Sequence, residues 1–178
     1  MQDVTLGSGE LYIKEFAGTM PENAALEVAE NKIGDIQGGA TVSYKPNVYT
    51  VVGDSGVTHK CFVTDSEVTF KSGILTWDNE VLEKISLCGE LTKTAGKSTL
   101  KLGKRGAIKN YIVRFVHTKD DNKKYRVTIV GTSQNGFELA FAGDKETVIH
   151  AEFVAGTLDA DGTKLILEEE IAAVKVAK

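Results

Sequence analysis

The sequence predicts a mainly β fold, a β-sandwich or barrel with one flanking α-helix at about residues 79–88 and a long loop between two early strands. Period-two alternation of apolar and polar residues dominates most of the chain, as in half-buried strands. Glycine-rich turns separate these short stretches, an arrangement typical of sandwiches and barrels. A length of 178 residues fits one domain, so we expect residues 1–178 to form a single unit.

The clearest element is a hairpin formed by residues 111–117 and 123–130. In the first strand Tyr111, Val113 and Phe115 alternate with residues of the opposite face. The polar stretch 119–122 lies between the strands and predicts the turn. The same reasoning predicts seven further strands, at residues 11–16, 40–45, 57–63, 67–76, 137–142, 147–154 and 164–168.

One segment has helical periodicity instead. Asp78 is a good N-cap residue, and Gly89 is a plausible C-terminal stop. Between them, apolar side chains recur at a spacing of three to four residues, and we expect Leu82 and Ile85 to pack against the sheet. The chain end, 169–178, fits neither period and is expected to form an arm.

The stretch 46–57 lies between two predicted strands and is too apolar for a solvated loop. A loop of this length is typically functional or interacting. The alternative is a strand extension that folds onto its own core, and the sequence leaves both open. The candidate interaction residues are Pro46, Asn47, Val48, Tyr49, Val51, Val52 and Asp54.

Composition argues against catalysis. The chain has two cysteines and three histidines, too few for a disulfide framework or a histidine-rich metal centre. No nucleophile–base pair, phosphate-binding loop or calcium loop has its full spacing. We therefore expect a non-enzymatic protein without a cofactor or metal. No apolar run approaches the length that crosses a bilayer, so we expect no membrane insertion.

Charge is unevenly distributed along the chain, although its net value is only −4. Basic residues concentrate between positions 91 and 126, and the flanking segments are acidic. Such a strip could bind nucleic acid, but few aromatic residues accompany it as stacking platforms. We therefore expect it to face another subunit. Its residues are Lys93, Lys97, Lys101, Lys104, Arg105 and Lys109.

Three segments resemble the major tail tube proteins of long-tailed, non-contractile bacteriophages. They are residues 7–13 (GSGELYI), 33–46 (IGDIQGGATVSYKP) and 70–78 (FKSGILTWD), the last leading into the predicted helix. Together they cover about the first half of the chain. None is a catalytic fingerprint, so the resemblance depends on their order and spacing.

The resemblance implies a structural virion protein that assembles into stacked, typically hexameric rings. These rings form the tail tube, the conduit for genome ejection into the host. In the family a long loop between two early strands reaches the neighbouring ring, and by position this loop is 46–57. The implied partners are further copies of the chain, tape-measure, tail-terminator and distal tail proteins, and double-stranded DNA that passes through the lumen without specific binding. The implied location is the phage tail, after assembly in the host cytoplasm.

Two alternatives remain open at this stage. A tube protein of a contractile tail or related injection machine would share the fold but need a sheath partner. A monomeric β-barrel binding module would need an exposed aromatic cluster, whereas the only tryptophan, Trp77, directly precedes the predicted helix and is expected to pack there.

Overall fold

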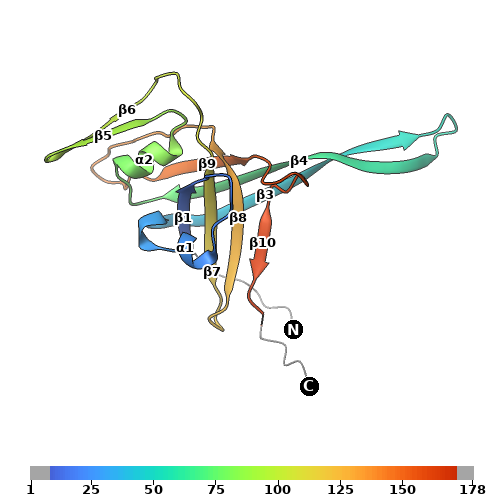
Figure 1. Ribbon diagram of the computed structural model, residues 1–178, viewed down its shortest axis with the longest axis horizontal. Coiled ribbons are helices and arrows are strands. Elements are labelled where there is room, and N and C mark those ends of the chain that lie inside the picture. The colour runs from blue at the N-terminus through green and yellow to red at the C-terminus, as the bar shows by residue number, and fades with distance from the viewer. Residues whose placement is uncertain (1–8, 172–178) are drawn as a thin grey trace.

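The computed structural model describes residues 9–171 and is built around one large antiparallel sheet. Figure 1 shows this sheet with a long two-stranded arm leaving it on one side. The eight strands of the sheet are β1 (Glu10–Glu15), β2 (Lys32–Ile33), β3 (Ile36–Val52), β4 (Thr58–Ile74), β7 (Tyr111–Thr118), β8 (Lys124–Ser133), β9 (Ile149–Ala155) and β10 (Ile166–Glu169). The predicted mainly β class is confirmed.

Smaller elements lie around this sheet. A separate hairpin is formed by β5 (Glu90–Thr94) and β6 (Lys97–Lys101). The helices are α1 (Asn23–Leu26), a 3₁₀ turn η1 (Ala29–Asn31) and α2 (Asn79–Ile85). The short α1 and η1 were not expected from the sequence, because a single turn carries too little periodicity to recognise.

The sheet folds over onto itself. Its strand order is β2-β1-β7-β8-β9-β4-β3, so β1 and β4 lie near opposite ends. Their side chains nevertheless share one buried cluster, in which Leu11 of β1 and Phe70 of β4 are both fully enclosed. The two edge strands β2 and β3 are also consecutive in the chain, and Leu75 N, just after β4, donates to the carbonyl of Asp35 between them (2.8 Å). The result is the predicted sandwich-like core.

The edge of β8 is shared between two strands. Its first half pairs with β10, from Ile166↔Thr128 to Glu169↔Tyr125. Its second half pairs with β9, beginning at Gly131↔Ala155. A Cβ on Gly131 would lie 2.1 Å from the carbonyl oxygen of Val154, so only glycine fits at this fork.

Helix α2 covers one end of the core, as predicted. The Asp78 carboxylate accepts hydrogen bonds from the amides of Glu80 and Val81, both at 2.9 Å, and so caps the helix. Leu82 and Ile85 are buried in the main cluster. The helix ends at Ile85 and not near residue 88, because Ser86 has extended backbone geometry.

Leu82→Ala and Ile85→Ala are each expected to lower the free energy of unfolding by about 2–5 kcal/mol, since each leaves a cavity in a packed core. Leu87→Ala is the matched control, because Leu87 is exposed and its truncation should change stability by less than about 0.5 kcal/mol. Urea denaturation of the three variants measures this. Equal, small losses at all three positions would contradict the packing described for α2.

Two of the strand predictions are corrected: 57–63 and 67–76 belong to one continuous strand, β4, and 137–142 is not a strand. Residues 137–142 form an irregular loop, although Phe137, Leu139 and Phe141 alternate as in a strand. The first two are partly buried against the main core and anchor the loop by side chains instead of backbone pairing. Phe141 is exposed, 6.2 Å from the ring of Trp77. Trp77 packs against the core at the β4–α2 junction, and its indole donates to Thr147 O (3.4 Å).

Candidate assembly surface

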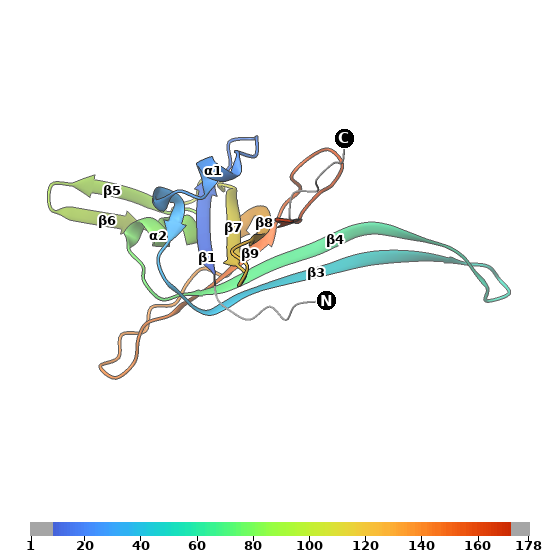
Figure 2. The ribbon, with the colours of Figure 1, turned by 90° about the horizontal axis from the view of Figure 1, so that it is seen from below.

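The most prominent feature projecting from the body is the outer part of the β3–β4 hairpin, which we call the ribbon and define as residues 44–68; only Val68, at its base, belongs to the core. β9 pairs with β4 only from Thr69 inward, so beyond that point β3 and β4 have each other alone. Pairing continues to Val52↔Thr58. Figure 2 shows the ribbon extending well away from the body. Among the described strands, none pairs with the outer edge of β3.

This geometry corrects the expected loop at 46–57. Its first seven residues belong to β3, and only 53–57 form a turn. The turn is closed by hydrogen bonds from Gly53 N to Val57 O (2.9 Å) and from Gly56 N to Gly53 O (2.8 Å). Gly56 has a φ of 78°, which favours glycine. The segment is therefore a strand extension, as the alternative expected, but it lies in solvent instead of folding onto the core, as that alternative also required.

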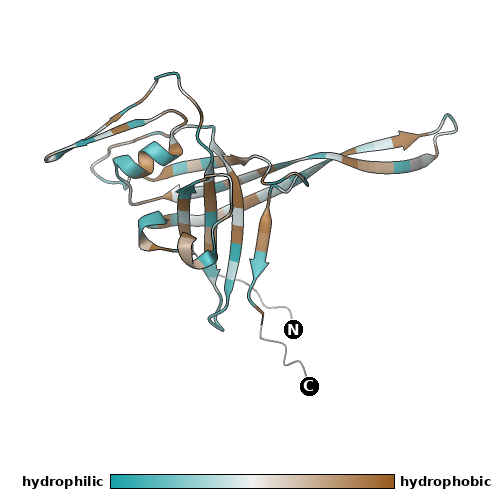
Figure 3. Ribbon diagram, viewed as in Figure 1, coloured by the Kyte–Doolittle hydropathy of each residue, from teal (hydrophilic) through white to brown (hydrophobic). Residues whose placement is uncertain are grey.

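Apolar side chains lie on both faces of the ribbon. Tyr49 lies opposite Phe62, with exposed fractions of 61% and 45%. Val48 lies opposite Val63, with exposed fractions of 56% and 65%. Neighbouring residues of a strand point to opposite faces, so these two pairs occupy different faces. Figure 3 shows the apolar colouring of this outer segment.

The remaining predicted loop residues also lie on the ribbon. Pro46 and Asn47 are paired in the β3–β4 ladder, opposite Ser66 and Asp65. Val51 and Val52 are exposed near the end of β3, and Asp54 is exposed in the turn. The structure thus brings all seven predicted residues onto one projecting element.

Sequence reasoning missed part of this surface. Phe62 and Val63 were assigned to a half-buried strand, and Tyr44 was not singled out. The available signal was the lack of alternation in both strands, because Val51-Val52 and Cys61-Phe62-Val63 are consecutive apolar residues. Consecutive apolar residues in a strand place apolar side chains on both faces, which in an isolated hairpin means exposure.

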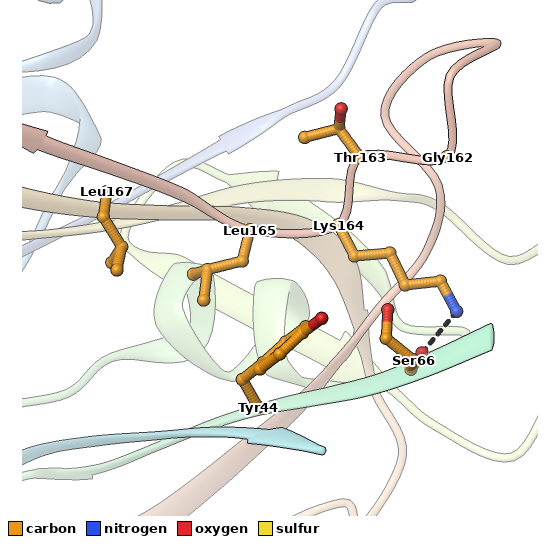
Figure 4. A pocket seen from close by; sticks show the side chains of 7 residues that line it. All are labelled: Tyr44, Ser66, Gly162, Thr163, Lys164, Leu165 and Leu167. Atoms are coloured by element: carbon orange, nitrogen blue, oxygen red, sulfur yellow. Dashed lines mark hydrogen bonds between the residues drawn. The ribbon is translucent and has the colours of Figure 1, made fainter. Parts of the chain in front are cut away.

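An apolar groove lies at the base of the ribbon. It has a volume of about 470 Å³, and Figure 4 shows Tyr44 of β3 facing Leu165 and Leu167 of the β10 segment. Tyr44 and Leu167 are more than half exposed, so the groove opens to solvent. One wall is fixed by Lys164, whose ammonium donates to Ser66 O (2.6 Å) and to the carboxylate of Asp65 (2.8 Å).

The predicted basic strip follows the β5–β6 hairpin and the extended segment after it. Lys93, Lys97 and Lys101 are on the hairpin, and Lys104, Arg105 and Lys109 follow it. Three of the six form ion pairs within the chain: Lys93 with Glu80, Lys104 with Glu90 (3.1 Å) and Lys109 with Glu15 (3.0 Å). Within residues 9–171, Lys97, Lys101 and Arg105 are exposed and have no ion pair.

A second group of charges lies beneath α1, on the sheet face opposite the main core; Glu27, Arg114 and Arg126 are buried, and the other members are partly exposed. We call it the charged cluster; its members are Glu27, Arg114, Lys124, Arg126, Glu168 and Glu170. Arg126 donates to Glu27 (2.5 Å), Glu168 (2.9 Å) and Glu170 (2.7 Å). The Glu27 carboxylate also accepts from Lys124 (2.7 Å).

Charge compensation in this cluster is nearly complete. Arg114 donates to Thr128 Oγ1 (2.9 Å) and Asn23 Oδ1 (2.5 Å), and its Nη1 lies 3.6 Å from Glu27. Burial alone would raise the pKa of Glu27, but the hydrogen bonds from Arg126 and Lys124 outweigh it and hold the pKa below its ordinary value of 4.5. The cluster therefore fastens α1 and β10 to β7 and β8, and gives the C-terminal wall of the groove a fixed position.

Among residues 9–171, no three His, Cys, Asp or Glu side chains are arranged to hold a metal ion. In the same part of the chain, no helix has the length and apolar character needed to span a membrane. The predicted arm at 169–178 begins at the end of β10, and its residues 172–178 lie outside the described part. No family model matches the chain, and no curated protein matches its sequence.

Proposed function

We propose that this chain is a structural subunit that assembles with copies of itself into stacked rings, forming the tube of a phage tail through which DNA passes. The observation that carries the proposal is the ribbon, which projects from a well-packed body and is apolar on both faces. The resemblance of segments 7–13, 33–46 and 70–78 to tail tube proteins supports the identity of the assembly.

The ribbon is energetically unsuited to remain in water. A two-stranded hairpin without further packing is at best marginally stable. Burying its apolar surface would contribute about 25 cal/mol per Å² removed from water. The free outer edge of β3 is a row of backbone donors and acceptors that another chain can pair with. A ribbon of this kind is best explained as one half of a protein interface.

Self-association supplies a partner for every such ribbon. Head-to-tail contacts between identical chains close into rings when the rotation permits and otherwise continue as helical filaments. A tube of stacked rings uses both closure around the axis and repetition along it. The acidic net charge of −4 also suits a conduit for DNA, because a strongly basic wall would retain the phosphate backbone.

Trimming the ribbon is the direct test. Replacing residues 48–64 with Asn-Gly joins the ladder partners Asn47 and Asp65 through a two-residue turn. We expect the trimmed chain to remain folded and to form no tubes under conditions in which the unmodified chain does, as measured by pelleting and negative-stain electron microscopy. The body lies outside the replaced segment, so its thermal transition should persist. Normal tubes from the trimmed chain would contradict the proposed role of the ribbon.

The two alternative functions predict different outcomes. A monomeric binding module would remain monomeric with or without the ribbon, while binding a glycan or nucleic acid through its exposed aromatic side chains. A contractile-tail tube protein would form tubes that also bind a sheath protein on their outer surface. Size-exclusion chromatography separates the first case from the proposal, and co-sedimentation with a sheath protein separates the second.

A further inference from the structure

The outer part of the apolar ribbon, around Tyr49 and Phe62, and the apolar groove lie on the same chain but cannot meet within it. Tyr44 lines the groove and also begins the ribbon. From Tyr44 to Val52 the strand advances by about 3.4 Å per residue, which places Val52 about 27 Å from the groove. β3 remains paired with β4 over this length, so the ribbon cannot double back. Within one chain, the outer ribbon and the groove stay apart.

We propose that the outer ribbon of one copy, around Tyr49 and Phe62, docks into the groove formed by Tyr44, Leu165 and Leu167 of a second copy. This inference rests on the proposed function and names the receptor for the ribbon. A projecting apolar element and an apolar hollow on one chain form a heterologous pair, which repeats from copy to copy. Every ribbon except those at the end of the assembly would then be covered.

The construction of the groove supports a docking role. Its two walls come from separate parts of the chain, the base of the β3–β4 hairpin and the β10 segment, and both are held in place before any partner arrives. Lys164 ties the β10 segment to β4 through Ser66 and Asp65. Arg126 ties β10 to β8 through Glu168 and Glu170. A preformed receptor lowers the ordering cost of binding.

The exposed backbone near the groove adds a second means of contact. The outer edge of β3 is unpaired among the described strands, and it passes the groove at Tyr44. An incoming ribbon could pair its backbone with this edge while its side chains enter the groove, as in strand addition to a sheet. Pro46 removes one donor from the edge, which limits pairing to the stretches on either side of it.

Cysteine crosslinking tests the contact directly. Cys61 lies on the ribbon opposite Thr50 and is exposed. Six residues separate Thr50 from Tyr44, so Cys61 is about 20 Å from its own groove and a short bis-maleimide cannot bridge them within one chain. In a Cys88→Ser background, Leu167→Cys should give a ladder of covalent oligomers after assembly. Dilute, unassembled protein should give none.

Thr92→Cys in the same background is the matched control, because Thr92 is exposed on the separate β5–β6 hairpin. Thr163→Cys, four residues before Leu167 on the same wall of the groove, gives a second crosslinking position. If a folded Leu167→Cys chain forms no tubes while the Thr92→Cys chain does, this result also supports docking of the ribbon in the groove. Tubes without a ladder at either groove position, or an equal ladder from Thr92→Cys, would overturn the inference while leaving the proposed function intact. An unmodified chain that never assembles would overturn both.

Discussion

A chain carrying Tyr49→Ser and Phe62→Ser is expected to fold as the unmodified chain does but to form no tubes. Both side chains are exposed and form a cross-strand pair on one face of the ribbon, so their removal leaves the core intact. Such a pair contributes only about 0.2–1 kcal/mol to stability. In an interface, buried aromatic anchors contribute about 2 kcal/mol or more each, and the loss is repeated at every contact of the polymer.

The matched control exchanges the two rings, as Tyr49→Phe with Phe62→Tyr, and preserves almost all of the apolar surface. This control should form tubes at close to the protein concentration at which the unmodified chain forms them. Thermal unfolding followed by circular dichroism verifies that both variants are folded, and pelleting with electron microscopy measures assembly. If the double serine variant forms tubes at the same protein concentration as the unmodified chain, this face of the ribbon is not part of the interface.

The largest effect on stability is expected from the charged cluster. Glu27→Ala should lower the free energy of unfolding by about 3–5 kcal/mol, because it leaves Arg114 and part of Arg126 without their buried counter-charge. Glu15→Ala is the control, since the Glu15–Lys109 pair is more than half exposed and such pairs contribute at most about 1 kcal/mol. Urea denaturation at neutral pH compares the two, and equal losses would contradict this account of the cluster.

The loss of stability caused by Glu27→Ala should depend on pH. Because folding lowers the pKa of Glu27, its contribution is present above its unfolded pKa and is lost as pH falls through the folded value. The stability difference between the unmodified chain and Glu27→Ala should therefore shrink as pH falls below 4.5, the ordinary value. A difference that stays constant through this range would show that the Glu27 charge is not the stabilising feature.

Sequence pattern was sufficient for elements whose limits are set by adjacent residues. The 111–130 hairpin and the helix after Asp78 were predicted in this way, and both are present. The polar turn of the hairpin and the Asp78 cap of the helix are local signals, and they hold although both faces of β7 and β8 are buried. The alternating loop at 137–142 shows the limit, because alternation also arises when two side chains anchor an irregular segment to the core.

The ribbon could not be derived in the same way. Its two faces are equally apolar, so the chain has no alternation there, and Pro46 together with the 53–57 turn resembled the punctuation of a loop. A buried strand has other elements packed on its two faces, and a projecting strand does not. Which case applies is a property of the whole fold.

The charged cluster was missed for a related reason. Arg114 and Lys124 alternate in sequence with the apolar residues of the 111–130 hairpin, so the pattern puts them on the opposite strand faces, where charged residues are ordinarily solvated. The structure covers this face with Leu26 of α1 and adds β10 beside β8 in the sheet, so that Glu168 reaches Arg126 from a distant part of the chain. Ile112 and Val130 on the same face are buried and were the available sign that it is covered.

Self-assembly is tested most directly by negative-stain electron microscopy of the purified, concentrated chain, alongside size-exclusion chromatography. We expect the unmodified chain to form hollow tubes or stacked rings with a central channel, in a concentration-dependent manner. A chain that elutes as a monomer at every concentration and shows no rings or tubes on the grid would contradict this expectation.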